Sequence, residues 1–88
     1  MSAVTRYPRP TAYWDFLTQV LFNVFQEQNA DLLVGKIRQA IQAAPIEEQL
    51  FFFHKEPFDI AVNMTRKPIN PTLLSDYLAL VSKLNWKP

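Results

Sequence analysis

The sequence predicts an all-α protein, a compact bundle of four to five short helices. Two observations carry this prediction. Apolar residues return at the spacing of one helix face in several segments, and asparagine or proline stands near the start of most of those segments. A chain of 88 residues buries somewhat over ~60% of its unfolded surface, which suffices for one modest core. We therefore expect a flexible N-terminal arm, residues 1–10, followed by a single helical domain, residues 11–88.

A broad apolar face begins after Thr11 and predicts the first helix. Steps of about 100° per residue gather eight large apolar side chains on one side of a helix over residues 11–25. They are Tyr13, Trp14, Phe16, Leu17, Val20, Leu21, Val24 and Phe25. Phe22 lies about 180° from Tyr13, on the polar side of the same helix. We expect the eight side chains in the core and the Phe22 ring outside it.

The second helix is predicted to begin at Asn29 and to end near Ala44. Asn29 is a typical N-cap residue, and Asp31 in the first turn interacts favourably with the helix dipole. Six residues form its apolar stripe. They are Leu33, Val34, Ile37, Ala40, Ile41 and Ala44. Gly35 lies inside this helix, where it costs up to ~1 kcal/mol relative to alanine unless another group packs closely against it.

Residues 45–64 allow two interpretations. In the favoured one, Pro45 stands in the first turn of a short third helix and Pro57 begins a fourth. In the alternative, the apolar stretches 50–54 and 58–62 are strands of a β-hairpin at about 50–64, which would make the fold α+β. Periodicity does not separate a helix from a strand in segments this short.

Asn70 and Pro71 predict the start of a last helix, because asparagine caps and proline suits the first turn. Seven apolar residues are expected to face inward. They are Leu73, Leu74, Tyr77, Leu78, Leu80, Val81 and Leu84.

Catalysis and metal binding have little support in the sequence. The absence of cysteine removes disulfides, thiolate metal sites and thiol nucleophiles together. His54 is the only histidine, so an enzyme or metal site would need it together with Glu56 and Asp59, and acids beside Pro57 are also ordinary at a helix start. We expect a non-enzymatic chain with no cofactor. No apolar run reaches the ~18 to 20 residues of a spanning helix, and we expect a cytoplasmic protein without a membrane partner.

A nucleic-acid partner is the second hypothesis for the function. The outer face of the second helix carries Lys36, Arg38, Gln39 and Gln42, which suits a helical DNA-binding regulator. A formal charge of +1 does not favour it, and Lys36 and Arg38 point about 200° apart on the helix. Mixed basic and amide residues are also the ordinary way to solvate an outer face.

Aromatic residues that do not fit their helices give the first hypothesis, a small protein-interaction or accessory module. Phe22 lies outside the main apolar face, and the three successive rings of Phe51, Phe52 and Phe53 span more than half a helix circumference. Trp86 also lies off the stripe of the last helix. Exposed aromatic patches mark protein interfaces. We take Phe22, Phe51, Phe52 and Trp86 as candidate contacts with a protein partner or a second copy.

Overall fold

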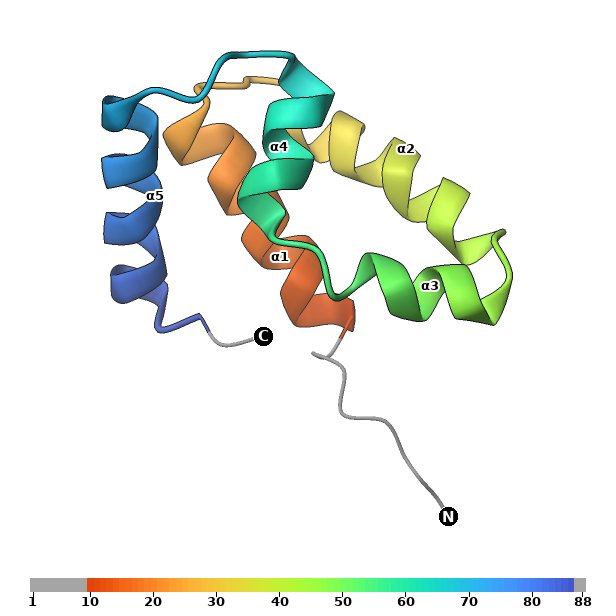
Figure 1. Cartoon of the computed structure of the whole chain (residues 1–88). Coiled ribbons are helices and arrows are strands. Elements are labelled where there is room, and N and C mark those ends of the chain that lie inside the picture. The colour runs from red at the N-terminus through yellow and green to blue at the C-terminus, as the bar shows by residue number, and fades with distance from the viewer. Residues whose placement is uncertain (1–9, 87–88) are drawn as a thin grey trace.

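The computed structural model describes residues 10–86, which form five α-helices and one π-helical segment (Figure 1). The elements are α1 (Pro10–Gln19), the π segment η1 (Val20–Val24), α2 (Ala30–Gln42), α3 (Ile46–Phe52), α4 (Pro57–Thr65) and α5 (Pro71–Leu84). No strand occurs among residues 10–86, so the all-α prediction is confirmed. The alternative hairpin at 50–64 is wrong, because α3 and α4 occupy that stretch. Residues 1–9 of the predicted arm lie outside the described residues, and Pro10 already belongs to α1.

The helices α2, α3 and α5 begin at or next to the residues that the sequence predicts, but only α5 has the expected side-chain cap. The Asn70 side chain accepts a hydrogen bond from the backbone N–H of Leu73 at 2.9 Å, and Pro71 occupies the first turn of α5. Asn29 does stand at the N-cap of α2, but its side chain makes no capping hydrogen bond. Pro45 is the N-cap of α3 rather than a first-turn residue, with an extended backbone.

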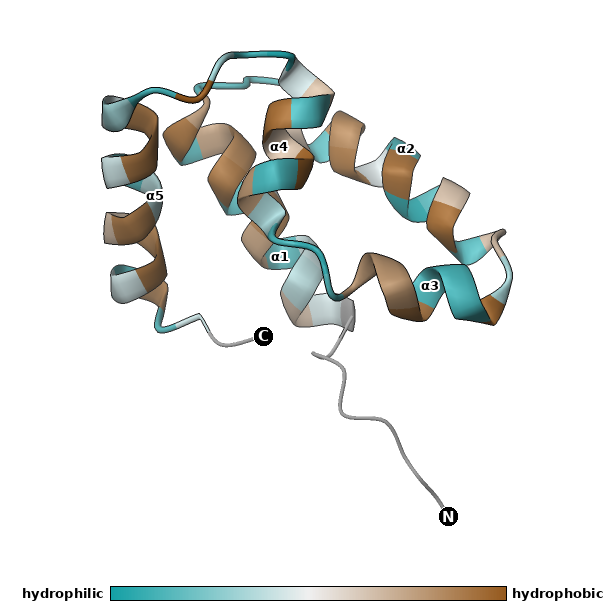
Figure 2. Cartoon of the chain, viewed as in Figure 1, coloured by the Kyte–Doolittle hydropathy of each residue, from teal (hydrophilic) through white to brown (hydrophobic). Residues whose placement is uncertain are grey.

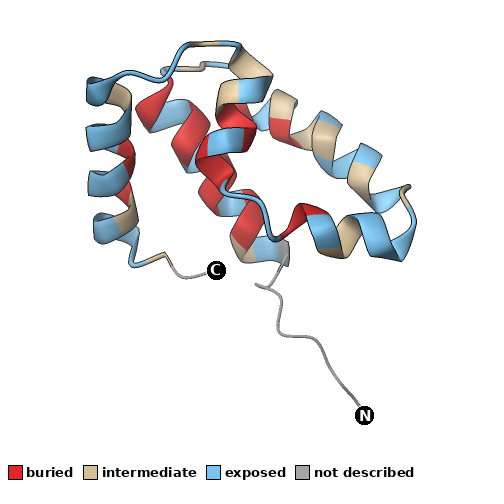
Figure 3. Cartoon of the chain, viewed as in Figure 1, coloured by how far each residue is buried: buried red, intermediate tan, exposed pale blue. Residues whose placement is uncertain are grey.

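The first helix and its π-helical continuation form the centre of the fold. All eight side chains of its predicted apolar face are buried, and Figure 3 shows this burial along most of its length. Helices α2 and α4 pack against α1, while α5 packs against η1. Because one helix carries so much of the core, the other four are held mainly through it.

The π-helical turn departs from the sequence pattern, which predicts one α-helix through Phe25. The N–H of Phe25 donates to the carbonyl of Val20 at 3.1 Å, and the N–H of Glu27 donates to that of Leu21 at 2.9 Å. The first bond reaches five residues back instead of four and so takes one extra residue into the turn, and the second reaches six residues back across Gln26. Val20, Leu21 and Val24 of this segment are buried, and Gln26, at a φ of 58°, follows its last turn.

Two tyrosines fasten the segment between α3 and α4 to the rest of the fold. The Tyr13 hydroxyl donates to the carbonyl of Lys55 at 2.9 Å, and the Tyr77 hydroxyl donates to Oε1 of Glu56 at 2.5 Å. Burial, followed by the negative charges of Glu56 and Asp59, raises the pKa of Tyr13. Burial, followed by the hydrogen bond to Glu56, raises the pKa of Tyr77. Both phenols are therefore held in their neutral, donating form.

The last helix buries less than the sequence predicts. Of the seven residues expected inside, Tyr77 and Leu80 are buried and Leu73 and Val81 are partly buried. The other three are exposed, and they are Leu74, Leu78 and Leu84. The reason is that α5 stands at the edge of the molecule and packs mainly on η1 (Figure 1). Figure 2 shows that its apolar residues are nevertheless concentrated toward α1.

The second helix is also less covered than its stripe suggests. Val34 is buried, Leu33, Ile37 and Ile41 are partly buried, and Ala40 is exposed. Ala44 lies beyond the helix end. Figure 1 shows the cause, since α2 diverges from α1 toward its junction with α3. No atom outside the helix backbone lies within 4 Å of a Cβ built on Gly35, so close packing does not require this glycine. No helix within residues 10–86 has the length and apolar character needed to cross a membrane.

Candidate protein-binding surface

Phe22 lies on η1 with 57% of its surface exposed, as the sequence predicts for a ring on the polar side of the first helix. It borders two adjoining hollows of about 290 and 240 Å³. The first is lined by Thr18, Gln19, Phe22, Gln28, Ala30 and Asp31. The second is lined by Phe22, Asn23, Gln26 and Gln28. The ring is therefore the shared apolar wall of a concave surface.

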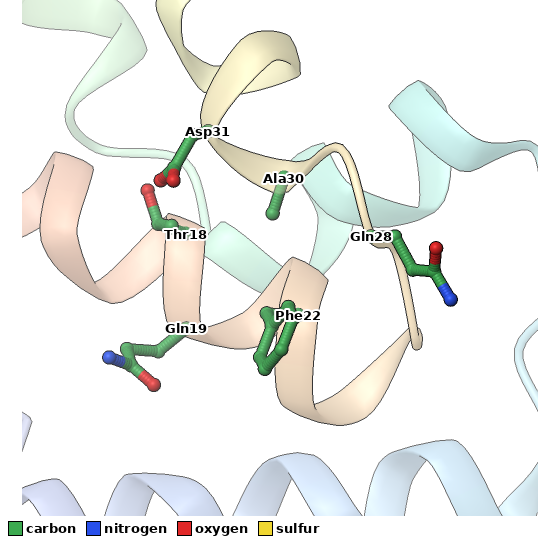
Figure 4. Close-up of a pocket in the computed structure, with 6 residues that line it drawn as sticks. All are labelled: Thr18, Gln19, Phe22, Gln28, Ala30 and Asp31. Atoms are coloured by element: carbon green, nitrogen blue, oxygen red, sulfur yellow. The ribbon is translucent and has the colours of Figure 1, made fainter.

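The close-up in Figure 4 shows how three segments build the first hollow. The Phe22 ring lies below the methyl group of Ala30, which comes from the first residue of α2. The Thr18 side chain and the Asp31 carboxylate point toward one another across the upper rim. The Thr18 hydroxyl also donates to the carbonyl of Trp14 at 2.9 Å. An apolar floor beneath a polar rim is the usual anatomy of a protein-binding patch.

The phase of the first helix, carried on through the π-helical turn, leaves this ring outside. Its neighbours Val20, Leu21 and Val24 take the buried side, so Phe22 has only the outer side. The end of the segment is tied down, because the ammonium of Lys67 donates a hydrogen bond to the carbonyl of Phe25. Single π turns are rare and occur frequently at functional sites. A fixed backbone also holds the ring in place before any partner arrives.

The other predicted contacts divide into one exposed ring and two that are wholly or partly covered. Phe51 is 67% exposed, and the Lys55 ammonium lies 5.2 Å from its ring centroid, which gives the ring a cation–π contact within the chain. The expected exposure of Phe52 is wrong. It is 5% exposed because it stacks on Trp14, with ring centroids 5.4 Å apart and planes at 25°.

Trp86 folds back past the end of α5 instead of projecting outward. Its ring stacks on Phe16 at a centroid distance of 4.5 Å and an angle of 11° between planes, and it is partly buried. This stacking joins the chain after α5 to the middle of α1. Because it is stacked and partly buried, Trp86 is not the freely exposed ring that the sequence predicts as a contact.

The four residues proposed for nucleic-acid binding are placed as expected, but their surroundings add no support for this hypothesis. Lys36, Arg38, Gln39 and Gln42 are all exposed along α2, as expected. The acid Asp31 and the apolar Leu32 are exposed on the same helix. The hypothesis stays a prediction, which duplex DNA binding at low salt would test.

The structure does not assemble His54, Glu56 and Asp59 into a metal site. Within residues 10–86, no group of three or more histidine, cysteine, aspartate or glutamate side chains could hold a metal ion. All three residues are exposed, and the Glu56 carboxylate accepts the hydrogen bond of Tyr77.

Exposed aliphatic residues are the functional candidates that sequence reasoning missed. Leu78 on α5 is 57% exposed, and Leu74 one turn earlier is 44% exposed. Ile46 at the start of α3 and Ile69 before α5 are exposed as well. A signal was present for α5, because its apolar positions cover more of the helix circumference than one neighbouring helix can bury.

Comparison with known proteins adds no relative from which a function could be transferred, since no family model, no curated protein and no solved structure matches the chain.

Proposed function

We propose that this chain is a non-enzymatic protein-interaction module that binds a partner through the surface around Phe22. The observation that carries the proposal is a large, 57% exposed aromatic ring that borders two adjoining hollows. Interface hot spots are enriched in aromatic side chains that meet a pocketed, complementary surface.

The energetics suit an anchor residue within a larger contact. Burying a phenylalanine side chain contributes roughly 1.5–3 kcal/mol, whereas a micromolar complex requires about 8 kcal/mol in total. Phe22 alone is thus too small, and the polar rim and neighbouring apolar groups must contribute the rest. Because 57% of the Phe22 surface is left to be buried by a partner, loss of the ring weakens binding by a factor of roughly four to twenty.

Affinity capture from the cells that express the chain tests the proposal. The immobilised full chain is compared with Phe22→Ser and with Phe51→Ser, and retained proteins are quantified by mass spectrometry. Phe51→Ser is the matched control, because it removes a ring of similar exposure from a different helix.

We expect at least one protein that wild type and Phe51→Ser retain and that Phe22→Ser loses. Circular dichroism establishes that each variant is folded. A retained set that is the same for all three proteins would show that Phe22 is a solvated ring without a binding role.

A further inference from the structure

One side of the first helix is left exposed to solvent from Asp15 to Gln26. Helices α2, α4 and α5 contact α1 and η1, and the remaining side carries residues three or four positions apart, from Ala12 and Asp15 through Gln19 to Asn23 and Gln26. Four hollows adjoin one another along this side. We call them together the α1 trough.

Neighbouring hollows along this side share lining residues. The hollow near the start of α1, about 330 Å³, shares Gln19 with the one in Figure 4. That hollow shares Phe22 with its neighbour, which in turn shares Asn23 with a hollow of about 310 Å³ against α5. Figure 4 shows α1 and η1 lying between α2 on one side and α5 on the other. The trough therefore has a helical floor and two walls.

The length of the trough matches a helix. From Ala12 to Gln26 the floor advances about 20 Å, at 1.5 Å for each residue of a helix. A bound α-helix of roughly fourteen residues, or four turns, spans the same distance. Apolar contact points lie along it, namely Ala12 and Leu84 near one end, Phe22 about 15 Å farther along the floor and Ala79 on the α5 wall.

The charge of the trough is opposite to that of the chain. Asp15, Asp31 and Asp76 line three of the hollows, and Lys83 is the one base among the lining residues of all four. The chain as a whole carries a formal charge of +1. Acids thus outnumber bases among the lining residues of the trough, and this excess of negative charge favours a cationic partner.

We infer that the α1 trough receives a basic amphipathic α-helix of a partner protein, with its apolar side on Phe22 and its lysine or arginine residues opposite Asp15, Asp31 and Asp76. This inference rests on the proposed function and names the kind of partner. If the occupant were a second copy paired face to face by a two-fold axis, the acids of one trough would face the acids of the other. The resulting repulsion disfavours a second copy as the occupant.

Two synthetic peptides of about fifteen residues test the inference. Both peptides have leucine and alanine at the same positions on one helix face. The polar face carries lysine in the first peptide and glutamate in the second. Binding to the full chain is measured by fluorescence anisotropy. We expect the lysine peptide to bind at least about tenfold more tightly at low salt, with a preference that shrinks as salt rises.

Variants locate the binding. Asp15→Asn, Asp31→Asn and Asp76→Asn combined should reduce the preference for the lysine peptide to within about twofold, whereas Asp59→Asn, an exposed acid on α4, should leave it unchanged. If the triple variant unfolds, the double variant Asp15→Asn with Asp76→Asn is used in its place. It keeps Asp31, the acid in the first turn of α2, which interacts favourably with the helix dipole. Phe22→Ser should weaken both peptides.

Each other outcome overturns the inference in a distinguishable way. Equal binding of both peptides that still depends on Phe22 removes the basic partner and leaves the proposed function intact. A preference for the lysine peptide that survives the aspartate substitutions places binding outside the trough. Absence of binding by either peptide rejects a helical occupant, while the proposed function is decided separately by affinity capture.

Discussion

Raising the pH beyond about 10 should progressively destabilise this protein, and finally unfold it, through the two tyrosines that hold the segment between α3 and α4. Tyr13 is 1% exposed and Tyr77 is 7% exposed. Burial is the first cause of the raised pKa of both phenols, and the Glu56 carboxylate is the second, by its charge on Tyr13 and by its hydrogen bond to Tyr77. Ionising either phenol in place would bury a negative charge beside another one.

The direction and size of the effect follow from proton binding. Above the ordinary tyrosine pKa of 10.0, the unfolded chain releases protons that the folded protein still holds. The free energy of unfolding is therefore unaffected by these groups below about pH 10 and falls as pH rises beyond it. Each phenol contributes about 1.4 kcal/mol per pH unit, and the two together roughly 2.7 kcal/mol per pH unit. A chain of this length is stabilised by roughly 4–13 kcal/mol in all.

The assay follows ionisation and folding in one titration. A Tyr7→Phe background leaves Tyr13 and Tyr77 as the only phenols, because the chain has three tyrosines. Phenolate absorbance and far-ultraviolet circular dichroism are recorded as pH is raised. We expect the two signals to change together, above the pH at which free tyrosine ionises. Phenolate absorbance that rises near pH 10 while helicity is unchanged would refute the reasoning.

Four substitutions test the packing and capping described above, with the free energy of unfolding measured by urea denaturation. Gly35→Ala should stabilise by about 0.4–1 kcal/mol, because the added Cβ meets no neighbour within 4 Å; a loss would reveal an unrecognised close contact. Asn70→Ala should destabilise by roughly 0.5–2 kcal/mol, because it removes the acceptor for the Leu73 N–H, and an unchanged value would mean that the cap is not formed in solution. Leu17→Ala, at a fully buried position, should cost roughly 2–5 kcal/mol. Phe22→Ser should stay within about 0.5 kcal/mol of wild type, and a core-sized loss there would place the ring inside the fold.

The core of the first helix was predictable because its pattern is long and consistent. Eight apolar positions over residues 11–25 fix which side faces inward, and the exposure of Phe22 follows from the same phase. The start of α5 was equally clear, since Asn70 and Pro71 each have one favoured role at a helix N-terminus.

Other features depend on contacts that a sequence pattern does not contain. The α-helical period fits residues up to Phe25 because Val24 and Phe25 are both apolar, so the extra residue of the π turn leaves no mark in the pattern. Three successive rings cannot all face one way, and which of Phe51, Phe52 and Phe53 stays outside depends on where α3 meets Trp14. The α1 trough is a property of packing, since its walls come from α2 and α5.

Photo-crosslinking from position 22 tests the central claim most directly. The photoreactive analogue p-benzoylphenylalanine replaces Phe22 in one protein and Phe51 in another, both are irradiated inside the cells that express the chain, and the adducts are identified by mass spectrometry. The account predicts a specific heteromeric adduct from position 22 that position 51 does not give, with the partner peptide carrying an excess of lysine and arginine. The same adducts from both positions, or none from position 22, would contradict it.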